Sequence, residues 1–130
     1  PGQRARARHG VQGVREQATA GYPLLREVAL PALRHALASD LPREAAMCQT
    51  LMQLIACVDD LNLLHRGGVD GLRWAQQQAR GFLDAGGAFV PGWQARLHSI
   101  GDGFVARRLS PGGSADLLAC AWFLLQQEVA

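Results

Sequence analysis

Five hydrogen-bonding side chains gather in the segment Asp59-Asp60-Leu61-Asn62-Leu63-Leu64-His65-Arg66. Residues 44–58 before it contain no Gly or Pro and predict one continuous helix. If that helix runs on, Asp59 continues its apolar stripe, and Asn62 and Arg66 lie within about 60° of Asp59. Burying a carboxylate, an amide and a guanidinium costs several kcal/mol unless they pair. The pattern predicts either a ligand site or a buried Asp59–Arg66 ion pair that ties two helices together.

The two adjacent carboxylates, Asp59 and Asp60, are candidates for catalysis and for binding Mg²⁺. Mg²⁺ commonly binds one or two carboxylate oxygens together with substrate phosphates, and a carboxylate can also accept a proton. A pair of solvated aspartates is the alternative interpretation. His65 points about 120° from Asp59 on an ideal helix, which favours a supporting or packing role. Gly67 and Gly68 then predict the end of this helix.

A second candidate site is the start of the last predicted helix, Ser110-Pro111-Gly112-Gly113-Ser114-Ala115-Asp116. The proline suits a first turn, and either serine can cap the helix. Gly112 and Gly113 leave room for a phosphate to reach the backbone N–H groups, where the helix dipole favours an anion. The alternative is an ordinary capped start in which Asp116 complements the dipole.

Helical periodicity recurs along the chain, and the alternation typical of strands is nearly absent. The predicted fold class is therefore all-α, a single compact bundle of about five helices. The first predicted helix covers about 24–38, and Pro31 kinks or splits it. The second covers 40–67, and the third covers 70–83 and is closed by Gly86-Gly87. A fourth begins at Pro91 and is interrupted by Gly101 and Gly103, and a fifth runs from the 110–114 turn to the end. The last helix is predicted to be mostly core.

Length and charge limit the classes of protein to which the chain can belong. Its 130 residues suffice for one domain with a real core, and the first residue, Pro1, indicates a piece of a longer polypeptide. All 13 basic residues are Arg, and the formal net charge is +2. Because these residues are dispersed apart from Arg4, Arg6 and Arg8, nucleic-acid binding is not expected. Residues 1–10 are expected to form a solvated, flexible arm.

Cysteine usage and hydropathy indicate a cytoplasmic protein. Cys48, Cys57 and Cys120 lie in apolar helical contexts without the close spacing that zinc sites need. They are predicted to be buried, reduced thiols. The longest apolar run, residues 117–125, is about half of a membrane span, so no membrane association is expected.

Two segments taken together resemble motifs of the triphosphoribosyl-dephospho-coenzyme A synthase family. They are residues 59–68 and residues 109–119, which occur in the family's order. The Ala20-Gly21-Tyr22-Pro23 turn and Arg107-Arg108 are also similar, closest to the branch that serves malonate decarboxylase rather than citrate lyase. The resemblance covers nearly the whole chain but only the C-terminal half of the family's length. Residues 1–130 therefore look like the C-terminal part of a larger all-α enzyme, with the missing N-terminal half as a partner.

The resemblance implies transfer of the 5-triphosphoribosyl group of ATP to the 2′-hydroxyl of 3′-dephospho-coenzyme A, with release of adenine. Asp59 or Asp60 would stabilise the reacting sugar, accept the hydroxyl proton or bind Mg²⁺. The implied substrate-binding residues are Asn62, His65, Arg66, Gly67, Gly68, Ser110, Gly112, Gly113, Ser114 and Asp116. The alternatives are a non-catalytic all-α nucleotide-binding or interaction fragment, and another Mg²⁺-dependent all-α nucleotide hydrolase. Assembly into a homo-oligomer is left open by the sequence.

Overall fold

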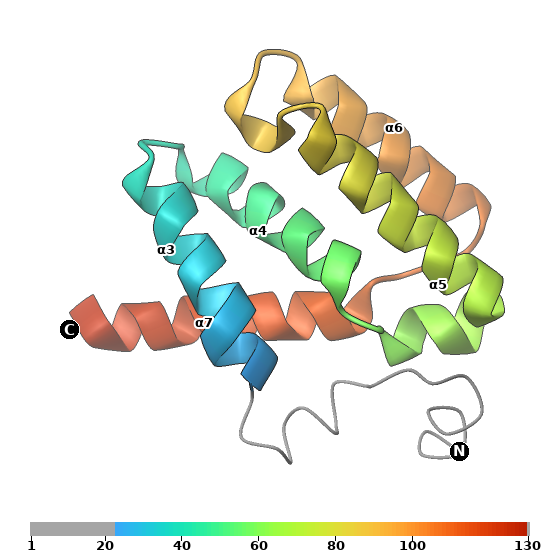
Figure 1. The fold of residues 1–130 in the computed structure, drawn as a ribbon, viewed down its shortest axis with the longest axis horizontal. Helices are drawn as coiled ribbons and strands as arrows, with labels where there is room; N and C mark the ends of the chain where they lie inside the picture. Colours follow the sequence, from blue (N-terminus) through green and yellow to red (C-terminus); the bar gives the residue numbers. More distant parts are fainter. Residues whose placement is uncertain (1–22, 130) are drawn as a thin grey trace.

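The computed structural model describes residues 23–129, and this part of the chain is built from helices without strands (Figure 1). The predicted all-α class is therefore confirmed. The elements are a π-helical turn η1 (Leu25–Ala29), α3 (Leu30–Ala38), α4 (Arg43–Cys57), α5 (Leu61–Asp84), a 3₁₀ turn η2 (Gly87–Phe89), α6 (Trp93–Ala106) and α7 (Gly112–Val129). The predicted arm over residues 1–10 and the Ala20-Gly21-Tyr22 part of the turn lie outside the described residues.

Pro31 divides the first predicted helix as expected. It occupies the first turn of α3, and the residues before it form the wider turn η1, in which the Leu30 N–H bonds to the Leu25 carbonyl. Proline lacks the N–H of a normal helical bond, and its ring crowds the carbonyl four residues earlier. The widened turn relieves that crowding.

The predicted single helix over residues 40–67 is wrong. Helix α4 ends at Cys57, and Val58 is extended, with φ −90° and ψ 133°. A new helix, α5, begins after Asp60, whose side chain accepts hydrogen bonds from its first-turn N–H groups. An aspartate that caps a following helix competes with continuation of the preceding one, and this explains the break.

The predicted stop at Gly67-Gly68 is confirmed as a break in the helical backbone, because two helical segments meet there within α5, and the second segment contains the predicted helix over residues 70–83. Gly68 has φ 67° and ψ −169°, so the short first segment and the long second segment of α5 run in different directions (Figure 1). Helix α6 forms straight through Gly101 and Gly103, which were expected to interrupt it. A Cβ at Gly103 would lie 2.9 Å from the Trp74 ring, so close packing accounts for the second of these glycines.

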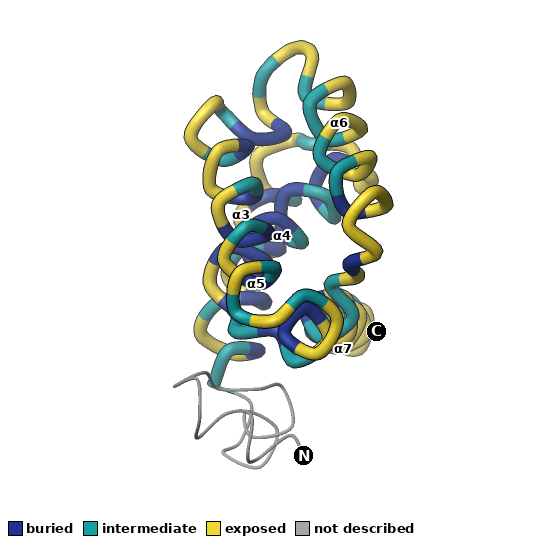
Figure 2. Tube along the Cα trace, turned by 90° about the vertical axis from the view of Figure 1, so that its right-hand side faces the viewer, coloured by how far each residue is buried: buried dark blue, intermediate teal, exposed yellow. Residues whose placement is uncertain are grey.

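Two apolar clusters share α4 as their common element, and Figure 2 shows α4 dark blue at the centre with α6 mostly exposed at the edge. The first cluster joins α4 to α5, η2 and α6, and includes Ile55, Leu72 and Phe82. The second joins α4 to η1, α3 and α7, and includes Leu54 and Leu117. Helix α4 therefore holds the two sides of the molecule together.

Helix α7 is less buried than its composition predicted. Leu117, Leu118 and Ala121 are buried, but Phe123 is 60% exposed and Leu124 is 37% exposed. The prediction that this helix is mostly core is wrong, because within the described residues no element covers its second apolar face.

The prediction of buried cysteines is also wrong. All three thiols are free, but Cys57 and Cys120 are exposed, and only Cys48 is partly buried. Burial raises the pKa of the Cys48 thiol, and the negative charge of Glu44 raises it further. Within residues 23–129, no helix has the length and hydropathy needed to cross a membrane.

Candidate functional site

The Asp60 carboxylate joins the two segments that the sequence singled out. Its Oδ1 accepts hydrogen bonds from the backbone N–H of Asn62 at 2.9 Å and of Leu63 at 3.4 Å. Its Oδ2 accepts from the backbone N–H of Ser114 at 2.9 Å and from the Ser114 hydroxyl at 3.1 Å. Asp60 and Ser114 are both fully buried. One carboxylate thus caps α5 and also supplies the anion at the N-terminus of α7.

The anion that complements the α7 dipole therefore comes from Asp60. Asp116, which the ordinary-cap alternative assigned to this task, is exposed. Ser114 serves as a hydrogen-bond donor to the carboxylate through both its N–H and its hydroxyl. The next residue, Ala115, donates its N–H to the Pro111 carbonyl at 2.9 Å in the first regular bond of the helix.

Close packing holds the same two segments together on either side of Asp60. A Cβ at Gly112 would overlap the side-chain amide of Asn62, and a Cβ at Gly67 would lie 2.7 Å from a methyl carbon of Leu109. Both glycines therefore permit approaches that a side chain would block. The segments 59–68 and 109–116 form one contiguous region, which we call the junction.

The end of α6 delivers Leu109 to the junction. Arg108 has a left-handed φ of 56°, and the Leu109 N–H bonds back to the Phe104 carbonyl at 2.9 Å. This is the bond pattern of a helix C-terminus that usually has Gly in the left-handed position. The preceding Arg107 guanidinium stacks on the Trp74 ring, 4.3 Å from its centroid, and this contact fixes the same turn.

Asp59 has different partners from the one predicted. Its Oδ1 accepts hydrogen bonds from Arg73 at 3.2 Å and from Gln76 at 3.1 Å. Gln76 is buried, donates to the Val58 carbonyl at 3.0 Å and accepts from Arg73 at 2.7 Å. The predicted Asp59–Arg66 pair is wrong, because the extended residues after α4 direct Asp59 toward the second segment of α5. A glutamine within the apolar stripe of that segment was the available sequence signal.

The predicted buried polar stripe is likewise wrong for its other members. Asn62 and Arg66 are exposed on the first segment of α5, so these side chains stay solvated and have no desolvation cost. His65, which is predicted to point away from this stripe, is exposed as well. Asn62 and Arg66 are four residues apart on one helix, and they therefore share a face. Ser110 and Gly68 are exposed, and Gly112 and Gly113 are partly buried. The structure brings these residues to one end of the molecule without enclosing them.

The two aspartates differ in how well they fit a metal ion. Both oxygens of Asp60 are occupied by N–H and O–H donors, so this buried carboxylate fits Mg²⁺ poorly. The Asp59 side chain is 25% exposed, and its Oδ2 accepts no hydrogen bond from residues 23–129. That single oxygen fits a Mg²⁺ ion held mainly by water and phosphates. No group of three His, Cys, Asp or Glu suited to a metal occurs in the described part.

Comparisons with known proteins give a consistent result. A family model described as ATP:dephospho-CoA triphosphoribosyl transferase matches residues 1–130. A probable 2-(5''-triphosphoribosyl)-3'-dephosphocoenzyme-A synthase of Citrobacter koseri is 46% identical over 125 residues, which are 96% of this chain and 41% of the relative. The synthase of Escherichia fergusonii is 43% identical over 116 residues, 89% of this chain and 38% of the relative.

The similarity extends to the synthase of Klebsiella pneumoniae, which is 42% identical over 90% of this chain and 39% of the relative. The chain thus spans about two-fifths of the length of the curated relatives it matches. No solved structure matches the chain.

Proposed function

Because the chain belongs to the ATP:dephospho-CoA triphosphoribosyl transferase family, we propose that it contributes the junction to that family's active site. The reaction transfers the 5-triphosphoribosyl group of ATP to the 2′-hydroxyl of 3′-dephospho-coenzyme A and releases adenine. The product would be the precursor of the prosthetic group on the acyl carrier protein of malonate decarboxylase. The single observation that carries the proposal is the Asp60–Ser114 bond, because it joins the two family-like segments into one site.

The reaction requires a carboxylate that can reach the substrate. Displacing adenine from C1′ builds positive charge on the ribose, which a nearby carboxylate stabilises, while a base accepts the proton of the incoming hydroxyl. Asp59 suits either task, because its Oδ2 is free of hydrogen bonds from residues 23–129 and its side chain is partly exposed. Arg73 and Gln76 hold its other oxygen and set its orientation.

Asp60 acts as a positioning residue in this proposal. Its buried carboxylate fixes the start of α7 against the start of α5, and it has no oxygen left for substrate. The first two N–H groups of α7 belong to Gly112 and Gly113, which are partly exposed, and within the described residues they bond to no carbonyl. They can therefore donate to a phosphate.

The triphosphate also needs positive charge. Arg66 is exposed at the junction and can bind phosphate oxygens in a bidentate manner, and Asn62 lies against Gly112 where a ribose or phosphate oxygen would approach. Mg²⁺, when bound at the Asp59 oxygen, would neutralise part of the phosphate charge. His65 lies on the same short helical segment and is exposed.

The test is adenine release in a two-chain mixture. This chain is combined with a polypeptide made from the part of the Citrobacter koseri relative outside the matched 125 residues, and ATP and dephospho-coenzyme A are added. We expect adenine only when both chains are present. We expect Asp59→Asn to lower kcat by a factor of hundreds. Because Asp59 forms a partly exposed ion pair, the change in unfolding free energy should stay below about 1 kcal/mol.

Asp84→Asn is the matched control, because Asp84 is an exposed aspartate at the far end of α5. It should leave kcat unchanged. If Asp59→Asn destabilises the chain but retains turnover per folded molecule, Asp59 is structural and the proposed site is wrong. Nucleotide binding without any adenine release would instead support the non-catalytic alternative.

A further inference from the structure

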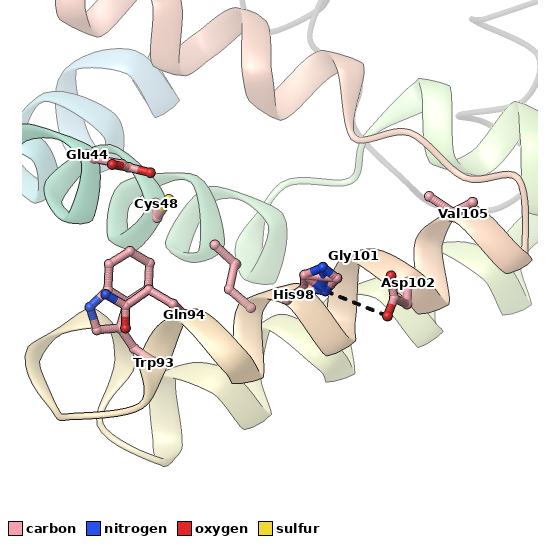
Figure 3. Close-up of a pocket in the computed structure, with 9 residues that line it drawn as sticks. Glu44, Cys48, Trp93, Gln94, His98, Gly101, Asp102 and Val105 are labelled. Atoms are coloured by element: carbon pink, nitrogen blue, oxygen red, sulfur yellow. Dashed lines mark ion pairs between the residues drawn. The ribbon is translucent and has the colours of Figure 1, made fainter.

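A groove of about 490 Å³ runs along α6 (Figure 3). One wall is a stripe of α6, formed by Trp93, Leu97, Gly101 and Val105, and the opposite side includes Glu44 and Cys48 of α4. The four α6 residues recur at intervals of four, so they follow one face of the helix over about 18 Å. Trp93 and Leu97 at one end of the stripe are partly buried against the first apolar cluster. Helix α6 packs mainly on α5 and η2, and α7 packs on α3, α4 and α5, so neither α5 nor α7 forms the wall of the groove opposite α6, which α4 provides.

Packing within residues 23–129 does not explain two residues of the stripe, Val105 and Gly101. Val105 is 77% exposed, an unusual position for a large aliphatic side chain at the edge of a groove. A Cβ at Gly101 would meet nothing within 4 Å, so no packing in the described part requires glycine there. Glycine inside a helix is unfavourable relative to alanine. An apolar stripe with a glycine at its centre is suited to the close approach of another helix.

Gly81 shows that a helical glycine with an empty Cβ position does not by itself indicate a docking face. A Cβ at Gly81 would also meet nothing within 4 Å, but most side chains that line the separate depression around it are polar, with Phe82 and Ile100 as its apolar members. Within residues 23–129, the α6 stripe places an open glycine beside an exposed apolar side chain, Val105, whereas Gly81 has no exposed large hydrophobic residue in its depression.

Charge at the edge of the groove indicates the chemistry of the partner. Glu44 lies on the α4 side, and the Asp102 side chain on the α6 side is 74% exposed. His98 contacts Asp102 at 3.7 Å, as the dashed line in Figure 3 marks, and it compensates that carboxylate only when protonated. A partner helix that carries an apolar stripe with basic side chains at its edges complements both carboxylates.

We propose that this groove binds an amphipathic, basic-edged helix from the part of the family's polypeptide that this chain does not span. More than half of the Citrobacter koseri relative lies outside the matched region, since the match covers 41% of it. The proposal rests on family membership and on the groove. It does not rest on the proposed activity, and its test measures binding only.

Two of the three free cysteines can report whether a partner covers the groove, because a thiol that a partner covers is alkylated more slowly. Cys48 lines the groove, whereas Cys120 lies on the exposed apolar face of α7 beside Phe123 and Leu124. The unaltered chain is mixed with a purified polypeptide made from the unmatched part of the Citrobacter koseri relative. Alkylation by iodoacetamide is then followed for each cysteine by mass spectrometry. We expect the two chains to co-purify, with Cys48 alkylated at least tenfold more slowly and Cys120 unchanged.

Two groove variants and one matched control complete the test. Gly101→Leu and Val105→Glu should each weaken the complex at least tenfold and restore alkylation of Cys48, and Gly101→Leu should not lower the melting temperature of the free chain. Gly81→Leu introduces the same side chain at an open helical glycine outside the groove and should leave the complex intact. Failure of the unaltered chains to co-purify would overturn the proposal. Protection of Cys120 without Cys48, or self-association of this chain alone through Val105, would overturn it as well.

Discussion

At the scale of single residues, the Asp60 carboxylate should respond sharply to the loss of its charge. In Asp60→Asn, one oxygen becomes an amide that must face either the α5 donors or the Ser114 donors. Donors would then meet donors in a fully buried position, and we expect a loss of roughly 2–4 kcal/mol in unfolding free energy. Urea unfolding followed by circular dichroism measures this change.

Asp116→Asn serves as the control, because Asp116 lies only two residues after Ser114 on α7 but is exposed. Removing its charge affects only a solvent-screened interaction with the helix dipole, which is worth less than about 1 kcal/mol. Equal losses in the two variants would show that the Asp60 bonds contribute no more than a surface charge does.

The partners of Asp59 mark the limit of residue-scale prediction. The sequence identified Asp59 and Asp60 as polar residues that follow an apolar helix, and both lie in the junction. The sequence could not supply the partners of Asp59, because Arg73 and Gln76 are 14 and 17 positions away and belong to a different helical segment. Helical spacing relates only residues on the same helix, so it predicted Arg66 instead.

At the scale of the helix, the Gly68 kink gives a matched pair of substitutions. Gly68 has φ 67° and ψ −169°, a conformation that residues with a Cβ rarely adopt. We expect Gly68→Ala to lower the unfolding free energy by roughly 1–3 kcal/mol, although a Cβ there would meet no neighbour. Gly81→Ala lies in the regular part of the same helix and should gain up to about 1 kcal/mol. Thermal melts of both variants measure the difference, and a stabilised Gly68→Ala would contradict the kinked conformation.

Periodicity predicted the helices well and their ends less well. Helices α3, α6 and α7 lie where the apolar spacing placed them, because that signal is local to each helix. The break between α4 and α5 occupies only Val58, Asp59 and Asp60, too few residues to disturb a repeat of 3.6. The sequence also could not predict which face of α7 is covered, because the apolar spacing of a helix does not identify the elements that pack on it.

At the scale of the whole molecule, α4 should make unfolding a single transition. Leu54 is fully buried and belongs to the cluster that includes Trp122, whereas Trp74 packs against the other cluster. We expect Leu54→Ala to cost roughly 2–5 kcal/mol. Variants that retain only Trp74 or only Trp122 should report the same urea midpoint, before and after this substitution.

Val105→Ala is the control for Leu54→Ala, because Val105 is 77% exposed. Its effect on the free chain should stay within about 0.5 kcal/mol. Separate midpoints for the two tryptophans would show that the clusters unfold independently and that α4 does not couple them.

The Asp60–Ser114 bond also sets an order of assembly during folding. It joins residues 54 positions apart, whereas the bonds from Asp60 to Asn62 and Leu63 span only two and three positions. Closing the longer loop has a larger entropic cost, so we expect the carboxylate to cap α5 early and to meet α7 only after α5 and α6 have folded back. The region proposed to meet the substrate is therefore completed among the last steps, and a chain still being synthesised has no junction until residue 114 has left the ribosome.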